Sequence, residues 1–340
     1  MDTLVRYANP PFNYLGTTLF VSYILLALYY SLSISSSLYA QYKRLPSLRL
    51  AEDVKNARSR HIMIYAFLAS VSFAILSYNM LNFLIQSLTA WARTQNILGR
   101  RVSLLGLRYW MLETSLFGTF AQELVGNRPS AFWTQAALLQ TWFWNLWMAY
   151  KVQQHKFSVR TMVPYAVLSQ ILPITFTASL FIIQLHLDAV GLSPHRWNTE
   201  ISKTTDPSKV SSPAAPTANT AVSQARKTSL VIPTILFNAA LLALSSLKGH
   251  STFIPLVLFT RVLLLIPSTG RIRFSQNDTL QSVSISFGFF VANLTMSRGT
   301  TTFGEVVNGL TIGGFATRTL GYDAELGLLL CAILRWSGGV

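Results

Sequence analysis

Long runs without charge dominate this chain and limit what it can fold into. No Asp, Glu, Lys or Arg occurs between Arg6 and Lys43, and residues 14–39 are dense in Leu, Ile, Val, Phe and Tyr. A helix of about 20 apolar residues crosses a hydrocarbon core of about 30 Å, because each residue adds about 1.5 Å. Similar runs recur along the chain. The pattern therefore predicts an all-α, polytopic transmembrane helix bundle.

The distribution of these runs predicts seven or eight spans. Two prolines, Pro164 and Pro173, interrupt the fourth run, which a membrane helix tolerates where a neighbour satisfies the freed carbonyl groups. The tail, residues 303–336, is apolar in two pieces separated by Arg318 and Asp323, so we expect one broken span or a re-entrant hairpin there. The other predicted spans are residues 14–39, 62–86, 131–150, 161–187, 229–247, 252–269 and 279–297.

Two segments do not fit the pattern of spans. Residues 100–126 are apolar on balance but contain charged residues, so we expect an amphipathic helix on or partly inside the bundle. Residues 192–228 are rich in Ser, Thr, Pro and Ala, which predicts a flexible polar linker. This linker divides the chain into a four-span half, residues 1–191, and a three- or four-span half, residues 229–340.

The basic surplus of the chain accompanies its apolar runs. The 340 residues include 27 Lys and Arg and 12 Asp and Glu, for a net charge of +15. Because the cations flank apolar runs, we expect a lipid bilayer as the partner and no nucleic acid. The basic loops 40–60 and 151–160 are predicted to face the cytosol, although the arginines of residues 93–108 contradict a simple assignment of orientation. The expected location is the membrane of the endoplasmic reticulum.

Motifs for nucleotide, dinucleotide, serine-hydrolase and zinc-hydrolase chemistry do not occur in the sequence. The single cysteine, Cys331, excludes an internal disulfide and a zinc cluster built from thiolates. The five histidines have no pair at metal-binding helical spacing. We therefore expect neither a metal nor a cofactor.

Few acids are available as catalysts, so elimination is informative. Glu113 and Glu123 lie in an apolar, aromatic segment, and Asp188 ends the fourth predicted span. Desolvation disfavours the anion, so a carboxyl group in such surroundings can donate a proton at neutral pH. Glu123, Glu113 and Asp188 are therefore the candidate catalytic acids. The alternative for the two glutamates is ion pairing with Arg108 or Arg128 near the membrane surface.

Aromatic residues recur at helical spacing near these acids. One face of a continuous helix would carry Glu113 between rings, and a second face, in the third span, would align Trp133 and Gln140 with two further tryptophans. Aromatic faces stabilise a cation by about 0.5–2 kcal/mol each, whereas tryptophans at span ends also form the ordinary interfacial belt. A cation within a predicted span should face the bundle and bind an acid or an anionic or phenolic group. The candidate substrate-binding residues are Trp110, Phe117, Phe120, Trp144, Trp147 and Arg261.

The stretch YWMLETSLFGTFAQELVGNRPSAFWTQAALLQTWFWNLWMAY, residues 109–150, resembles the fungal membrane-bound terpene cyclases of the ascofuranone and macrophorin pathways. The resemblance implies cyclisation of a farnesyl chain on a prenylated phenolic or polyketide-derived small molecule. It further implies initiation by protonation of an olefin or epoxide, without a metal or redox cofactor. The family's catalytic residues do not map onto this sequence, so Glu113 and Glu123 are inferred from their apolar neighbours alone.

The sequence thus predicts a non-metal, acid-initiated terpene cyclase of isomerase or lyase type, acting in meroterpenoid biosynthesis. A small-molecule transporter is the first alternative, in which Arg261 and helices broken at Pro164, Pro173 and Pro267 would form a site at mid-membrane. A membrane scaffold without catalytic activity is the second. Inverted-repeat symmetry would favour transport, and an aromatic cavity holding a carboxyl group would favour the cyclase.

Overall fold

The computed structural model describes residues 10–44, 52–96, 103–155, 157–191, 229–269, 275–297 and 302–337. Every regular element within these ranges is a helix, which confirms the predicted all-α class for the described residues. The predicted linker, residues 192–228, lies outside them.

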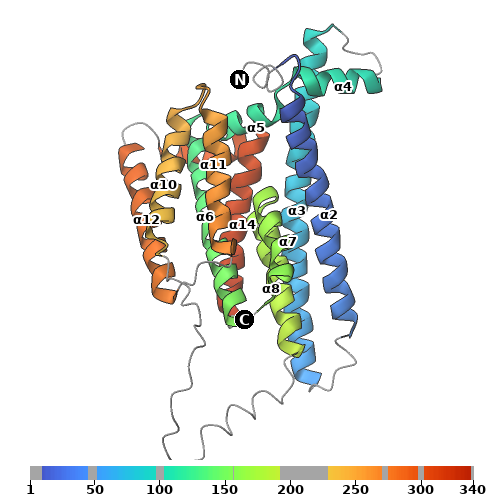
Figure 1. Ribbon diagram of the computed structural model, residues 1–340, viewed down its shortest axis with the longest axis vertical. Helices are drawn as coiled ribbons and strands as arrows, with labels where there is room; N and C mark the ends of the chain where they lie inside the picture. Colours follow the sequence, from blue (N-terminus) through green and yellow to red (C-terminus); the bar gives the residue numbers. More distant parts are fainter. Residues whose placement is uncertain are drawn as a thin grey trace, which may run out of the picture.

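The N-terminal half is built on three long helices. Helices α2 (Tyr14–Arg44) and α3 (Glu52–Thr94) run in opposite directions along one side of the molecule, and α6 (Arg128–His155) runs through its middle (Figure 1). The amphipathic segment forms two short helices at one end, α4 (Leu104–Glu113) and α5 (Leu116–Leu124). Helix α4 lies across the bundle axis instead of along it (Figure 1). The segment expected to form one amphipathic helix thus forms two, and its position relative to a membrane stays a prediction.

Two helices are long and apolar enough to cross a membrane: α2 and the Lys55–Thr94 part of α3. Only 22% and 28% of their most apolar windows are buried, whereas a core helix of a soluble protein is mostly buried. Large apolar side chains such as Leu32, Phe67 and Tyr78 point outward instead. These helices support membrane association. The larger count of seven or eight spans stays a prediction, since the other apolar helices that qualify by composition are shorter.

The predicted fourth span consists of two helices and not one. Helix α7 (Val159–Ile171) ends just before Pro173, which lacks an N–H group, and α8 (Ile174–Gly191) begins directly after it. Tyr165 and Phe181, placed symmetrically about Pro173, have ring centroids 5.4 Å apart, so the two helices fold back on each other as a hairpin. Pro164 lies inside α7 without ending it. The prediction of a single interrupted span is therefore wrong.

The turn of this α7–α8 hairpin is held by a buried carboxylate. Asp323, which is 3% exposed, accepts hydrogen bonds from the backbone N–H groups of Ile174 at 2.9 Å and Thr175 at 3.1 Å. The hydroxyl group of Thr175 donates to the backbone carbonyl of Asp323 at 3.0 Å. The first N–H groups of a helix have no partner within it, so this carboxylate satisfies two donors that would otherwise be buried unpaired.

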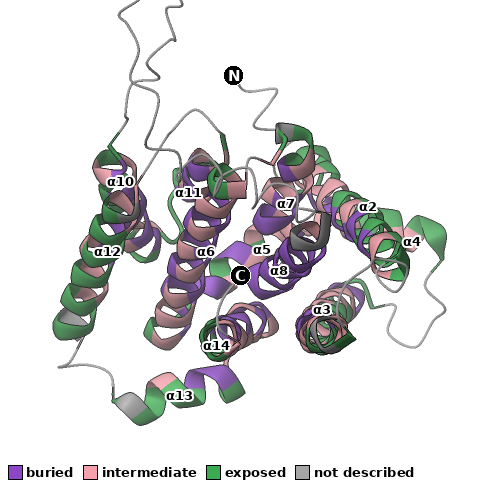
Figure 2. Cartoon of the chain, turned by 90° about the horizontal axis from the view of Figure 1, so that it is seen from below, coloured by how far each residue is buried: buried purple, intermediate pink, exposed green. Residues whose placement is uncertain are grey.

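The C-terminal half adds α10 (Val231–Ser246), α11 (Phe253–Leu265) with its 3₁₀ turn η2 (Ile266–Thr269), α12 (Gln276–Ser297), α13 (Phe303–Ile312) and α14 (Phe315–Trp336). Hydrogen bonds join α10 to α12: Thr234 to Ser282 at 2.7 Å, and Asn238 to Ser286 at 2.9 Å. Figure 2 shows α8 almost wholly buried at the centre, while α12 lies at the edge with much of its surface exposed. Helix α14 packs against α3, α6 and α8.

The apolar tail is broken at a different place from the one predicted. The break falls at Gly313 and Gly314, between α13 and α14, whereas Arg318 and Asp323 both lie inside the continuous helix α14. A Cβ atom on Gly313 would be 2.1 Å from the carbonyl oxygen of Gly309, so the turn has no room for a side chain there. Steric demands of the backbone, and not the charges, set this boundary.

Candidate functional site

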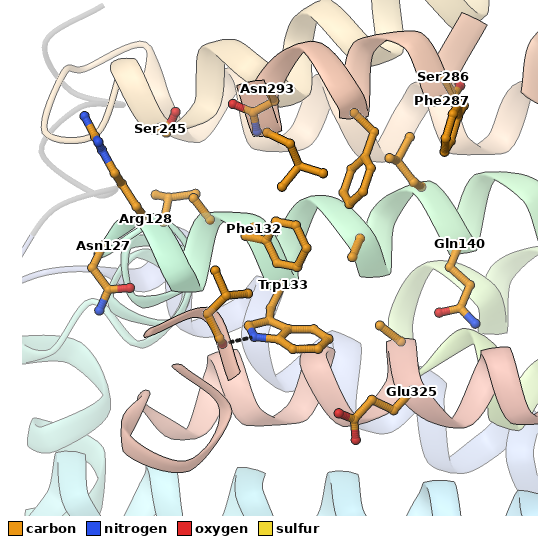
Figure 3. A pocket seen from close by; sticks show the side chains of 18 of the residues that line it. Asn127, Arg128, Phe132, Trp133, Gln140, Ser245, Ser286, Phe287, Asn293 and Glu325 are labelled. Carbon is orange, nitrogen blue, oxygen red and sulfur yellow. Dashed lines mark hydrogen bonds between the residues drawn. The ribbon is translucent and has the colours of Figure 1, made fainter. Parts of the chain in front are cut away.

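A cavity of about 1440 Å³ lies between α6, α10, α12, α13 and α14. Its walls are largely apolar, as in most small-molecule sites. Figure 3 shows the aromatic rings of Phe132 and Trp133 projecting from α6 into this space. The aromatic lining residues are Phe132, Trp133, Phe143, Phe287 and Phe290.

Helical spacing explains how both long walls face the cavity. On α12, Val283, Phe287, Phe290 and Leu294 recur every three or four residues and so share one face. On α6, the small side chain of Ala136 lies between larger ones of the same face, which leaves space beside the helix. The two long walls of the cavity are therefore formed by two stripes of residues, one on α6 and one on α12, that lie far apart in the sequence.

The ring of Trp133 is fixed in place at this site. Its indole N–H donates to the backbone carbonyl of Val306 on α13 at 2.8 Å (Figure 3). Phe132 packs against Phe290 of α12, with ring centroids 5.3 Å apart. These contacts join α6 to α12 and α13 and hold the rings of Phe132 and Trp133 in position.

Polar groups are few in the cavity and occupy distinct places. Arg128 and Lys248 lie toward one end, where the Lys248 ammonium group donates to the carbonyl of Gly126 at 2.9 Å. Glu325 is exposed on α14 and is one of the lining residues, with its carboxyl group turned away from the rings of Phe132 and Trp133 (Figure 3). An apolar body with cations at one end suits an elongated ligand that carries an anionic or phenolic group.

Gln140 is a lining residue at the other end of the cavity (Figure 3). Both polar atoms of its amide are buried without a hydrogen-bond partner. The amide packs directly on Gly327 of α14, where a Cβ atom would be 1.7 Å from Nε2. A buried unsatisfied amide costs about 1–3 kcal/mol, which marks this contact between α6 and α14 as strained in hydrogen bonding.

Glu123 is placed at the start of α14 and does not line the cavity. Its carboxylate accepts the backbone N–H of Ala316 at 2.9 Å, and a Cβ atom on Gly314 would collide with it at 1.7 Å. Burial raises the pKa of Glu123, and this effect is opposed by the hydrogen bond from Ala316 and by the charge of Arg318. The contact joins α5 to α14, so Glu123 acts as a helix cap in this structure.

Glu113 is held by α3 and not by the aromatic residues of its own segment. Its Oε2 atom accepts hydrogen bonds from the indole of Trp91 at 2.7 Å and the amide of Gln95 at 3.1 Å. Helix α4 ends at Glu113, and α5 begins at Leu116 after an extended residue, Thr114. The predicted continuous face joining Trp110, Glu113, Phe117 and Phe120 is therefore wrong.

The predicted aromatic residues are spread over three places. Trp110 is buried and donates to Ser87 at 3.2 Å, and Phe120 meets Phe83 edge-on in the same packed cluster. The ring of Phe117 lies 6.3 Å from that of Tyr23. The remaining pair belongs to the core around α8, where Trp144 and Trp147 pack edge to face at 5.2 Å.

Asp188 and Arg261 are also separate from each other. Asp188 is partly buried near the C-terminal end of α8 and interacts electrostatically with His155. Arg261 is partly buried on α11, and its guanidinium group donates to the carbonyl of Gln170 at 3.2 Å, at the last turn of α7. A cation next to the C-terminal end of a helix is favoured by the exposed carbonyl groups there.

None of the nine predicted site residues lines the large cavity. The residues that do line it come mostly from α6, α12 and α14, and sequence reasoning did not assign them a role. In the sequence, the shared helical face of Trp133 and Gln140 is the signal that points to this cavity. The stripe of lining residues on α12 is the second signal, because it forms the opposite wall.

Within the described residues, no group of three or more His, Cys, Asp and Glu side chains is placed to hold a metal ion. No family model matches the chain, and neither the curated proteins nor the solved structures include a detectably similar one.

Proposed function

We propose that the protein is a membrane-bound terpene cyclase that cyclises the prenyl chain of a phenolic or polyketide-derived small molecule in secondary-metabolite biosynthesis. One observation carries the proposal: a largely apolar cavity of about 1440 Å³ that five aromatic residues line, with cations at one end. A prenyl chain is long and apolar, which suits the body of the cavity. The phenolic head group suits the end near Arg128 and Lys248.

The proposed reaction needs an acid, a folded apolar chain and protection from water. A carboxylic acid protonates an olefin or epoxide of the chain, the resulting carbocation is attacked by an internal double bond, and loss of a proton gives the product. The product therefore has the same mass as the substrate. Aromatic faces such as those of Trp133 and Phe290 stabilise the cation without reacting with it as water would.

Glu325 was not one of the acids selected from the sequence, but it is the acid among the residues that line the cavity. Glu123 and Glu113 are engaged in hydrogen bonds with Ala316 and Trp91 and do not line the cavity. Glu325 is therefore the first candidate for the acid, and Glu123, Glu113 and Asp188 follow it.

A bundle of seven or eight spans in the endoplasmic reticulum is part of the proposal. Two apolar helices with exposed apolar side chains support insertion into a bilayer. The end of the molecule where α2 stops and α3 begins carries Lys43, Arg44, Lys55, Arg58 and Arg60, which supports a cytosolic location for that end.

Expression in yeast microsomes tests the proposal. A prenylated phenol and its terminal epoxide are supplied separately, and mass spectrometry searches for a new product of unchanged mass. We expect such a product from the wild-type protein and a loss of at least about 100-fold with Glu325→Gln, as for removal of a general acid. Glu52→Gln, an exposed acid at the opposite end of the molecule, is the matched control.

Two results would count against the cyclase. The absence of any isomer from both substrates, with protein present in the membrane, contradicts the function itself. An isomer formed at the wild-type rate by Glu325→Gln moves the acid to Glu123, Glu113 or Asp188, whose Gln or Asn variants are measured in the same assay.

A small-molecule transporter is a second candidate, favoured by one observation. Arg261 contacts Gln170 at the end of α7, just before the break of the α7–α8 hairpin, and helices broken within a bundle are common at transporter sites. A transporter moves its substrate unchanged. Uptake of the supplied phenol into sealed vesicles without a new product, abolished by Arg261→Gln, would favour transport over cyclisation.

A further inference from the structure

The two cations at one end of the large cavity have no carboxylate partner within the described ranges of the chain. Lys248 and Arg128 are both exposed lining residues, and neither forms an ion pair there with an Asp or Glu side chain. Glu325, the acid among the lining residues, lies away from this end (Figure 3). The carboxylate of Glu305, in the first turn of α13, accepts the backbone N–H of Thr302 at 3.1 Å. This end of the cavity therefore carries a net positive charge.

The polar side chains at this end offer mostly hydrogen-bond donors. The Lys248 ammonium group donates to the carbonyl of Gly126, which also lines the cavity, so the ammonium nitrogen lies at the cavity edge with donors to spare. The side-chain oxygen of Asn127 already accepts the backbone N–H of Ser130 at 2.8 Å, which leaves its amide nitrogen as a donor. The guanidinium group of Arg128 has donors only. A phenol is uncharged at neutral pH and needs an acceptor for its own proton, whereas a carboxylate only accepts, so these donors suit a carboxylate better.

Aromatic side chains follow these cations along α6. Phe132 and Trp133 lie about one turn after Arg128, which is about 6 Å along the helix axis. Figure 3 shows both rings between the end that holds Arg128 and the remainder of the cavity. An aromatic ring that carries a carboxylate would therefore lie beside these two rings, and its prenyl chain would continue into the apolar body of the cavity.

We propose that the cavity selects a substrate whose aromatic ring carries a carboxylate, so that the substrate class is a prenylated aromatic acid and not a neutral phenol. This inference rests on the proposed cyclase function. Lys248 and Arg128 determine the specificity, because hydrogen bonds to an ionised group are about twice as strong as those between neutral groups. The first turn of α6, which begins at Arg128, adds the positive end of a helix dipole at the same place.

Equilibrium binding to the full chain in a neutral detergent tests the proposal. The ligands are a farnesylated hydroxybenzoate, its methyl ester and the corresponding farnesylated phenol, and binding is measured at neutral pH by quenching of tryptophan fluorescence. The hydroxybenzoate should bind at least about tenfold more tightly than the other two, as expected for a charge-assisted contact. Because both cations are exposed, salt at about 1 M should remove most of this preference. Equal dissociation constants for the acid and the ester would overturn the proposal.

Variants locate the preference for the acid at the two cations. Lys248→Gln and Arg128→Gln should each reduce it at least about threefold, and the double variant should abolish it without changing the affinity for the ester. Lys248→Arg keeps the charge and should retain the preference. Arg108→Gln is the matched control, because Arg108 is exposed on α4, at the same end of the molecule (Figure 1), and does not line the cavity. A full preference in the double variant would overturn the site.

A fatty acid and the isomerisation assay supply two further outcomes. Palmitate, a carboxylate without an aromatic ring, should bind at least about threefold more weakly than the hydroxybenzoate. Equal affinity would assign this end of the cavity to a lipid head group and overturn the proposal. Binding does not require turnover, so a preference for the acid without any isomer contradicts the cyclase alone. Isomers formed from acid and ester that bind equally well contradict the substrate class alone.

Discussion

The charged groups at the turn of the α7–α8 hairpin bind backbone groups, whereas Glu325 at the large cavity is exposed. At the turn, Asp323 accepts two backbone N–H groups at the start of α8, and Arg261 donates to a carbonyl at the end of α7. At the cavity, Glu325 is exposed on the wall and Arg128 lies near one end. The difference teaches that an ionisable residue inside an apolar bundle is not by itself a functional residue, because a broken helix also needs charges at its two new ends.

The largest expected effect comes from removing the carboxylate at the turn of the α7–α8 hairpin. Asp323→Ala removes the acceptor of two buried N–H groups, so we expect the free energy of unfolding to fall by about 3–5 kcal/mol and the unfolding temperature by about 10 °C. Thermal unfolding in detergent measures the change. Asp323→Asn keeps one acceptor oxygen and should lose less than half as much. An alanine variant as stable as the wild type would show that the carboxylate does not hold the turn.

The contact of α6 with α14 behind the cavity should give the next largest effect. Gly327→Ala places a methyl group where the Gln140 amide lies, so we expect a loss of about 1–3 kcal/mol. The double variant with Gln140→Ala should recover most of that loss, because it removes both the collision and the unsatisfied amide. A thermodynamic cycle of the four proteins measures the coupling. Strict additivity would contradict the contact.

Glu123→Ala tests the cap that joins α5 to α14 and should cost about 1 kcal/mol, or about 2–4 °C in unfolding temperature. Glu123→Gln keeps an oxygen that can accept the N–H of Ala316, and should lose less. The comparison separates the hydrogen bond from the charge. If the Gln variant were less stable than the Ala variant, the cap would not be the role of this residue.

The smallest expected effect on stability comes from a substitution on the wall of the large cavity. Phe287 is 64% exposed, so Phe287→Ala should change the free energy of unfolding by no more than about 0.5 kcal/mol. Its loss should nevertheless weaken binding of a prenylated phenol about fivefold, measured by quenching of tryptophan fluorescence. Leu280→Ala is the control, since Leu280 is 57% exposed on the same helix and does not line the cavity. Equal effects of both variants on binding would place the ligand elsewhere.

Several of the helices could be predicted, because they follow from uncharged apolar runs. The predicted runs 131–150, 229–247 and 279–297 correspond to α6, α10 and α12. The breaks were harder to predict. Two prolines in one run look equivalent in sequence, yet Pro173 ends a helix and Pro164 does not, since tertiary contacts decide which freed groups are satisfied.

The candidate site was predictable only in its type of chemistry. An aromatic cavity with a carboxyl group was expected, but periodicity within one segment selected Glu113 and its neighbours. The cavity is instead made by faces of α6 and α12, which meet through Phe132 and Phe290. The break within residues 100–126 was also not predicted: the extended residue Thr114 ends α4, so that α5 does not continue its face. Pairing of distant helices is tertiary information that a single sequence does not carry.

The length of α3 sets the depth of the α4 region. Its 43 residues extend about 65 Å, roughly twice the thickness of a hydrocarbon layer, so under the proposed insertion in a bilayer both of its ends would lie in head groups or water. Trp91, near the second end, donates to Glu113, which fixes α4 at that level. Under the same proposal, α4 would lie at the lipid surface, and a ligand that enters the bundle from that end would pass close to it.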